Sequence, residues 1–259
     1  MEDDSKHVVY NNSVNKAFMI LEYLATMNDP LDLGVIAREL EVNKSTTYRF
    51  LAAMEELGYV NKDKESGKYS LGSKVVWLAS RFLDSLDIRH LAKPVLKRIM
   101  EETGETIHLA MLDALEVVYI DKIDGKQPVQ MASRVGRRMP AHSTGLGKAL
   151  LMAQPPQTWH SYVEKIGLKK YTNNTITDAE SFYACMENDH QRGFSIDNFE
   201  NEDGICCVAV PIYDFKGKPV AALSISGWTV SMSPERAISL APLAKEAARE
   251  ISERLGRSG

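Results

Sequence analysis

The sequence predicts an α+β protein with a small N-terminal domain and a larger C-terminal domain. Residues 13–57 carry apolar side chains at three- and four-residue spacing, which is typical of amphipathic helices. Beyond residue 88, helical patterns alternate with short apolar runs typical of strands. With 259 residues, 44% of them hydrophobic, the chain can form two separate cores. The predicted segments are a disordered tail over 1–12, a domain over 13–73, a linker helix over 74–87 and a second domain over 88–259.

Three short helices and a hairpin are predicted in the N-terminal domain. Apolar residues repeat with helical spacing in three successive segments, 13–27, 33–40 and 44–57. Gly58 suits the left-handed end of the third helix. Two short strands then flank the turn-forming residues 65–67 and are expected to pair. These strands are residues 59–61 and 68–70.

The linker helix and the C-terminal elements follow from the same periodicities. Apolar side chains surround much of the linker helix, so we expect it to pack against a second copy of the chain. In the C-terminal domain, antiparallel strands with helices on both sides suit a sensor-like α+β domain. The expected helices are 88–102, 146–152, 178–191 and 234–254. The expected strands are 106–112, 117–122, 129–133, 206–213 and 220–226.

The helix that begins at Lys44 carries residues suited to DNA contact. A short helix and a three-residue turn precede it, which is the spacing of a helix-turn-helix. Hydroxyl groups reach phosphates or base edges, and Arg also engages guanine. The hairpin resembles a wing that tracks the DNA backbone. The predicted DNA-binding residues are Lys44, Ser45, Thr46, Thr47, Tyr48 and Arg49 on the helix, with Lys62, Lys64 and Lys68 on the wing.

The net charge of −4 gives no overall attraction to nucleic acid, so this prediction depends on local charge. An alternative stays open on pattern alone: the N-terminal unit is a small helical domain with a solvated face, or a protein-binding module without DNA. The basic groups gather on the two elements that should touch DNA. A linker helix also offers the dimer that palindromic half-sites require. Both features favour DNA binding.

Several other classes of protein are disfavoured. Apolar runs such as 205–212 are far shorter than the roughly 20 residues of a membrane helix, so a cytoplasmic protein is expected. Three cysteines, two of them adjacent, do not suggest a disulfide framework. No metal-ligand spacing or phosphate-binding glycine loop is present, so we expect no metal, no cofactor and no enzyme. The enzyme alternative is a small-acid hydrolase with Cys207 as nucleophile and His142 as base.

Six short motifs are typical of one known family. They are residues 43–51, 57–60, 68–72, 104–109, 140–149 and 204–211. Through them the chain resembles the IclR family of bacterial transcription regulators from Ser13 to Leu255. The resemblance implies an N-terminal winged helix-turn-helix, a C-terminal GAF-like effector-binding domain, and a homodimer or dimer of dimers on a double-stranded operator. Repression is the commoner mode in the family.

The resemblance also implies a small carboxylate effector, such as a keto acid, sugar acid or aromatic acid. Residues 104–109 and 133–138 are most similar to those of regulators of the sugar-acid, 2-keto-3-deoxygluconate type. The implied effector-binding residues are Gly145, Leu146, Asp197, Cys207, Ser224 and Ser226. Backbone N–H groups where a helix begins suit a carboxylate, and Asp197 suits ligand hydroxyls. An alternative interpretation is purely structural: a glycine where a helix begins, hydroxyls within the core, and a buried thiol.

Two further features of the C-terminal domain have alternative readings. Arg134, Arg137 and Arg138 could attract an anion, but we interpret them as a solvated or subunit-contact loop. Cys206 and Cys207 could sense oxidation, but neighbouring residues of a strand point to opposite faces, which favours a structural role.

Overall fold

The computed structural model describes residues 12–84, 87–129 and 131–257, so the predicted tail lies outside the described residues except for Asn12. The chain divides into two compact units, Met1–Ser85 and Leu86–Gly259. Within the described residues, no helix is both long enough and apolar enough to cross a membrane.

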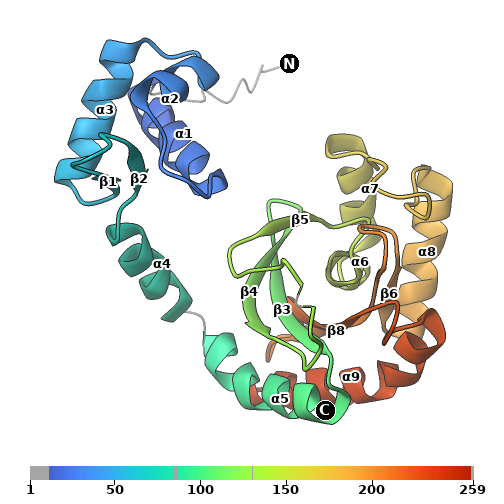
Figure 1. The fold of residues 1–259 in the computed structure, drawn as a ribbon. Coiled ribbons are helices and arrows are strands. Elements are labelled where there is room, and N and C mark those ends of the chain that lie inside the picture. The colour runs from blue at the N-terminus through green and yellow to red at the C-terminus, as the bar shows by residue number, and fades with distance from the viewer. Residues whose placement is uncertain (1–11, 85–86, 130, 258–259) are drawn as a thin grey trace. The chain divides into compact units, whose positions relative to one another are not determined.

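The first unit is a three-helix domain with a hairpin and a following helix (Figure 1). Its elements are α1 (Asn12–Thr26), α2 (Leu33–Glu39), α3 (Lys44–Glu56), β1 (Val60–Lys62), β2 (Tyr69–Leu71) and α4 (Lys74–Asp84). Ile20, Ile36 and Leu51, one from each of the first three helices, are fully buried in a common core. Gly58 has a φ of 81°, which supports the predicted end of the third helix. Each strand begins one residue later than predicted.

The second unit is one antiparallel sheet with helices on both faces. In space the strands follow the order β5-β4-β3-β8-β7-β6. The strands are β3 (Thr106–Asp113), β4 (Glu116–Ile123), β5 (Arg138–Pro140), β6 (Ser195–Asn198), β7 (Ile205–Tyr213) and β8 (Pro219–Trp228). The helices are α5 (Asp87–Thr103), α6 (Gly145–Met152), α7 (Pro156–Lys165), α8 (Ala179–Arg192) and α9 (Pro234–Arg254).

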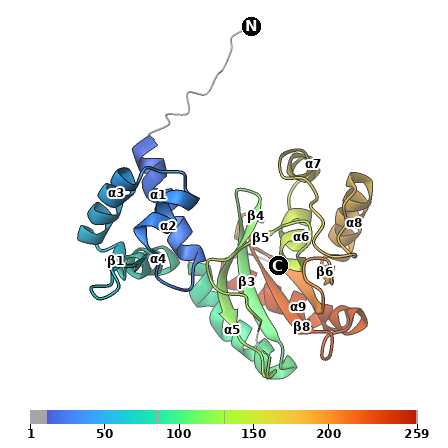
Figure 2. The ribbon, with the colours of Figure 1, turned by 45° about the horizontal axis from the view of Figure 1, so that its top comes forward.

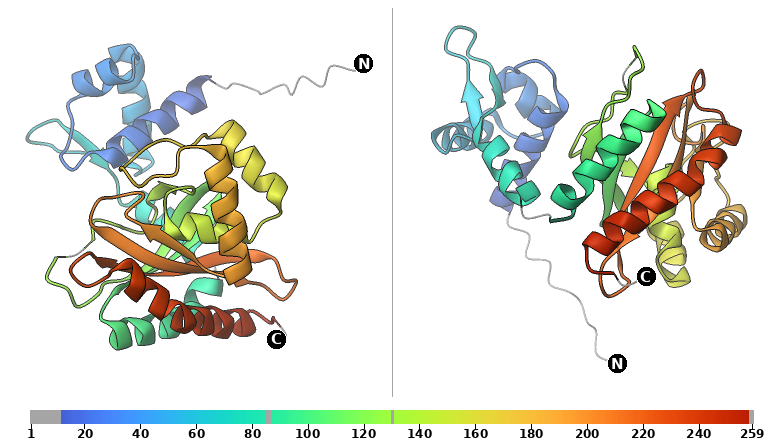
Figure 3. Two further views of the ribbon diagram at one scale, coloured as in Figure 1. Left: turned by 90° about the vertical axis from the view of Figure 1, so that its right-hand side faces the viewer. Right: turned by 90° about the horizontal axis from the view of Figure 1, so that it is seen from below.

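The helices divide between the two faces of this sheet. Helices α6, α7 and α8 lie on one face (Figure 2), and α5 and α9 lie side by side on the other (Figure 3). Successive side chains of a strand point to opposite faces. On β7, Cys206 therefore packs in the core under α5 and α9, whereas Cys207 faces α6. The two thiol side chains therefore lie on opposite faces of the sheet, as the sequence predicted.

One predicted strand of the C-terminal domain was wrong, and three elements were not predicted: β5, α7 and β6. Residues 129–133, apart from the undescribed residue 130, form no strand. Two carbonyls in this segment, of Met131 and Ser133, instead accept hydrogen bonds from the Lys122 ammonium at 2.8 and 2.9 Å. The strand in this region is β5. Helix α7 and strand β6 were not predicted: only Trp159 and Tyr162 of α7 are buried, and β6 has four residues.

Candidate effector pocket and DNA-binding surface

Helix α3 presents most of its predicted DNA-binding residues to solvent. Lys44, Ser45, Tyr48 and Arg49 are exposed, and Thr46 is half-buried. Thr47 is fully buried, and its hydroxyl donates to the carbonyl of Asn43 at 3.2 Å. Residues three or four apart on a helix share a face, so Thr47 packs on the face of Leu51 and Met54, toward the core. Thr47 cannot reach DNA in this conformation, and the prediction for that residue was wrong.

The hairpin has the shape of a short wing with a fixed tip. The Asp63 carboxylate accepts hydrogen bonds from the backbone N–H and the hydroxyl of Ser66, at 2.7 and 2.6 Å. Lys64 is exposed at this tip, while Lys62 and Lys68 are half-buried on the two sides. The Lys62 ammonium lies 5.3 Å from the centre of the Tyr69 ring. The wing therefore carries three lysines, of which Lys64 is the most open to a partner.

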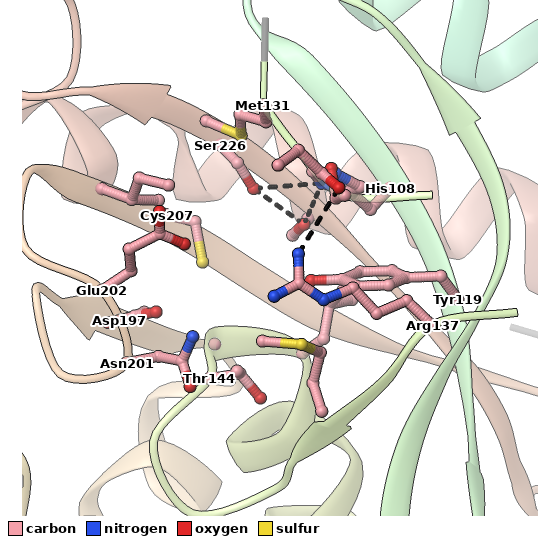
Figure 4. Close-up of a pocket in the computed structure, with 17 residues that line it drawn as sticks. His108, Tyr119, Met131, Arg137, Thr144, Asp197, Asn201, Glu202, Cys207 and Ser226 are labelled. Atoms are coloured by element: carbon pink, nitrogen blue, oxygen red, sulfur yellow. Dashed lines mark hydrogen bonds between the residues drawn. The ribbon is translucent and has the colours of Figure 1, made fainter. Parts of the chain in front are cut away.

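A cavity lies in the second unit between the sheet and the beginning of α6 (Figure 4). Its volume is about 50 Å³, room for only a few water molecules. All six residues that the resemblance implied line this one cavity: Gly145, Leu146, Asp197, Cys207, Ser224 and Ser226. They come from α6, β6, β7 and β8, so the sheet and one helix bring together residues far apart in the sequence.

The beginning of α6 is held tightly against β7. Thr144 caps the helix, because its hydroxyl oxygen accepts from the Gly147 N–H at 3.2 Å. A Cβ atom at Gly145 would lie 2.5 Å from the Cys207 sulfur, so only glycine fits there without movement. The carbonyl of Gly145 accepts from the Ser195 hydroxyl at 2.6 Å. Gly145 and Leu146 thus border the cavity, and because Gly145 has no side chain, its backbone is directly exposed to the cavity.

Ser224 and Ser226 belong to a hydrogen-bonded chain that crosses the cavity wall. Their hydroxyls lie 3.0 Å apart, and each approaches Nδ1 of His108, at 3.5 and 3.3 Å. Nε2 of His108 lies 2.7 Å from the Ser133 hydroxyl. Burial, together with the nearby Lys122, lowers the pKa of His108 to about 3. His108 is therefore neutral at physiological pH and can accept a hydrogen bond at one nitrogen.

Asp197 and its neighbours form the acidic wall of the cavity. Oδ1 of Asp197 accepts from the Glu200 N–H at 2.7 Å. Burial, reinforced by the Glu200 carboxylate, raises the pKa of Asp197 to about 7. Glu200 is itself paired with the buried Lys148 of α6. Burial opposes the charge on Lys148, but the Glu200 carboxylate outweighs it and raises the pKa of Lys148 above its ordinary value.

The sequence interpretation missed several cavity residues. Tyr119, Asn201, Glu202 and Arg137 also line it, and Arg137 was interpreted as part of a solvated or subunit-contact loop. Tyr119 lies on β4, whereas the contact of the other three with the cavity depends on the path of two loops, which local periodicity does not reveal. Arg138 is different, because its guanidinium pairs with two carboxylates outside the cavity.

The residues of the hydrolase alternative do not form a catalytic pair. Both ring nitrogens of His142 are occupied, by the Tyr162 hydroxyl and the Lys169 carbonyl, each at 2.9 Å. Burial and the neighbouring Asp197 raise the pKa of the Cys207 thiol, so it stays protonated and a poor nucleophile. In addition, His142 is not among the residues that line the cavity with Cys207.

Both units match known protein families. The IclR helix-turn-helix domain matches residues 13–64, and the family described as "Bacterial transcriptional regulator IclR C-terminal" matches residues 80–253. The regulator KdgR of Escherichia coli K12 is 36% identical over 247 residues, 95% of this chain and 94% of KdgR. The acetate operon repressor of Salmonella typhimurium LT2 is 31% identical, over 93% of this chain and 88% of the repressor.

Solved structures agree with these matches. The Thermotoga maritima IclR structure has a TM-score of 0.78 and 38% identity, over 95% of this chain and 99% of that one. An IclR homolog of Microbacterium hydrocarbonoxydans, complexed with 4-hydroxybenzoate, has a TM-score of 0.82 and 25% identity, over 95% and 100%. These relatives are transcription regulators rather than enzymes, as the sequence predicted. The chain therefore belongs to the IclR family of transcription regulators, with an N-terminal DNA-binding unit and a C-terminal effector-binding unit.

Proposed function

We propose that this regulator represses transcription by binding an operator through α3 and the β1–β2 wing, and that a small hydroxylated carboxylic acid in the α6 cavity changes that binding. The observation that carries the proposal is the meeting of six effector-binding candidates in one cavity. The assigned domains are 13–73 for DNA binding, 74–87 for the connection and 88–259 for the effector. Binding to bacterial DNA requires a cytoplasmic protein.

The chemistry of the cavity favours a sugar acid or keto acid. Backbone N–H groups at the beginning of a helix attract a carboxylate, because they lack partners within the helix and carry the positive end of its dipole. Ser224 and Ser226 offer buried hydroxyls, and Asp197 offers a carboxyl group, for the hydroxyls of a ligand. A hydrocarbon acid without hydroxyls would add no hydrogen bonds to those that these three groups already make within the protein, so it would gain less affinity. The hydroxyl groups of the acid are therefore part of its recognition.

We further propose a homodimer, with pairing of dimers, as the state that binds DNA. Helix α4 exposes three large apolar side chains in a row: Val76, Trp77 and Leu78. Apolar groups exposed together on one helix are typical of an interface. Because α4 joins the two units, it is also the element through which a bound effector can act on the DNA-binding units. A coupling of about 1–3 kcal/mol would change operator affinity roughly 5- to 150-fold.

The DNA-binding half is tested by replacing Arg49 with alanine. The probe is the duplex that wild-type protein selects from a random library, and the readout is its dissociation constant at fixed salt. If Arg49 reads a base, Arg49→Ala weakens binding by about 1–3 kcal/mol. Arg249→Ala, which removes an exposed arginine of α9 in the other unit, is the matched control and should bind as wild type. Equal affinity of Arg49→Ala and wild type would contradict the assignment.

The effector half is tested by thermal shift with sugar acids, 2-keto acids and aromatic acids. A ligand at 100 times its dissociation constant stabilises the folded state by about 2.7 kcal/mol. The shift should vanish in Ser224→Ala and persist in Ser239→Ala, which removes an exposed hydroxyl of α9. Ser224→Ala should still bind the operator but no longer respond to the acid. Loss of operator binding with unchanged acid affinity would remove Ser224 from the pocket assignment.

A further inference from the structure

Arg137 is the permanently charged cation among the described residues that line the effector cavity. Figure 4 shows its guanidinium in the middle of the cavity, beside Tyr119. Backbone hydrogen bonds hold the residue there: the Tyr119 N–H donates to the Arg137 carbonyl at 3.2 Å, and the Gly136 N–H donates to the Tyr119 carbonyl at 2.8 Å. Gly136 has a φ of 84°, which lets the chain turn sharply before Arg137. The position of Arg137 is thus set by its backbone contacts with β4.

The charge of Arg137 has no carboxylate partner among the described residues. Within the described part of the chain, its guanidinium makes one hydrogen bond, a long contact of 3.4 Å to the carbonyl of Ala132. The next residue, Arg138, begins β5 and shows how an arginine with a structural role is paired. Its guanidinium lies 2.7 Å from Glu116 and 2.9 Å from Asp113. Arg137 therefore keeps its donors available for a ligand, whereas Arg138 does not.

The other charged groups of the cavity favour a role for this cation in binding an acid. Asp197 and Glu202 line the wall, and both are carboxylic acids. His108 is neutral, as described above, and the beginning of α6 supplies only a partial positive charge, roughly half an elementary charge. Without Arg137, an entering carboxylate would have only this partial charge to attract it, while the Glu202 carboxylate would repel it. The planar guanidinium also matches the two oxygens of a carboxylate.

We propose that Arg137 is the specificity-determining residue of the effector cavity: it pairs with the effector's carboxylate and so selects a sugar acid over the neutral sugar alcohol of the same skeleton. This inference rests on the proposed function and narrows its ligand. Arg137 is accessible to solvent, so an incoming acid can reach it before the buried serines. Because the cavity holds only a few waters with the guanidinium inside, the side chain must turn as the acid enters.

The experiment is calorimetric titration of the full-length protein with gluconate, 2-ketogluconate and 2-keto-3-deoxygluconate, with sorbitol as the neutral counterpart. Arg137→Met keeps much of the length of the side chain and removes its charge. A charge-assisted hydrogen bond of ordinary strength predicts that the best acid binds Arg137→Met about 10- to 100-fold more weakly. Arg137→Lys should keep part of the affinity, because the charge stays but the planar fork is lost.

The matched control is Arg134→Met, an exposed arginine of the same loop that does not line the cavity, and it should bind within about twofold of wild type. Thermal midpoints without ligand show whether each variant is folded. Unchanged acid affinity in Arg137→Met, with binding lost in Ser224→Ala, would overturn the role of Arg137 and leave the proposed function standing. Sorbitol binding to wild type as tightly as the acid would also overturn the role of Arg137. No binding of any acid to wild type would overturn both.

Discussion

The Lys148→Met substitution tests the buried ion pair beneath the effector cavity. The side chains of Lys148 and Glu200 are only 2% and 8% exposed. Without the ammonium group, Glu200 would remain buried with a single donor, the Asn198 N–H at 3.4 Å, and its other oxygen already has no partner. Removing one member of a buried pair typically costs 3–5 kcal/mol, so we expect about that loss of unfolding free energy.

The second substitution needed is Glu200→Gln, which removes the opposite charge. In the double variant Lys148→Met/Glu200→Gln no unpaired charge remains at the pair, and replacing a whole buried pair is often close to neutral. The costs of the two single changes should therefore not add. We expect a coupling free energy of about 2–3 kcal/mol, near the upper end for residues in direct contact. Lys97→Met, which breaks an exposed pair with Glu101, should cost less than about 1 kcal/mol.

The assay is urea unfolding followed by tryptophan fluorescence. The chain has three tryptophans, of which Trp77 belongs to the first unit. In a Trp77→Phe background the signal comes from Trp159 and Trp228, so it reports the effector-binding unit alone. A cost below about 1 kcal/mol for Lys148→Met, or costs that simply add in the double variant, would refute the reasoning from the buried pair.

Three other predictions concern the cavity and the dimer interface. The pKa of Asp197, about 7, should rise further when an acid binds beside it. Binding then takes up a proton, so wild-type affinity measured by calorimetry should fall as pH rises from 6 to 8; an equally steep profile in Asp197→Asn would contradict this. Gly145→Ala should lower the thermal midpoint and weaken acid binding, because its Cβ would lie 2.5 Å from the Cys207 sulfur; Cys207→Ala should restore part of both, and no rescue would count against the clash. Trp77→Glu, at a side chain 58% exposed on α4, should increase the monomer fraction in sedimentation velocity, and unchanged assembly would exclude Trp77 from the dimer interface.

Most of the fold was predictable because it follows local periodicity. The bounds of α3 and α9 agree with the apolar spacing to within a residue, and β7 and β8, both predicted, are the longest of the described strands. The failures come from elements without a clear repeat. Residues 129–133 look like a strand, yet their carbonyls bond to a lysine side chain. Strand β6 exists because β7 pairs with it, which no local pattern reveals.

The candidate site was also predictable only in part. The six effector-binding candidates came from motif resemblance, and the sheet does bring them to one cavity. Arg137 was interpreted only as part of a solvated or subunit-contact loop; it is exposed and also lines the cavity, which its local sequence pattern does not reveal. Thr47 was misread for a related reason: all hydroxyl residues at the beginning of α3 looked alike, and only packing showed that this one is buried.

The sequence by itself determined the family, the order of the elements and which residue types are available for DNA and acid binding, because these depend on spacing along the chain. Only the tertiary structure decided which groups are charged, paired or within reach of a ligand. A carboxylate such as Asp197 has an ordinary pKa in an exposed segment, and its raised pKa arises from burial beside Glu200. Lys148 and Arg137 are both cations in the sequence, but Glu200 neutralises the first and no described carboxylate neutralises the second.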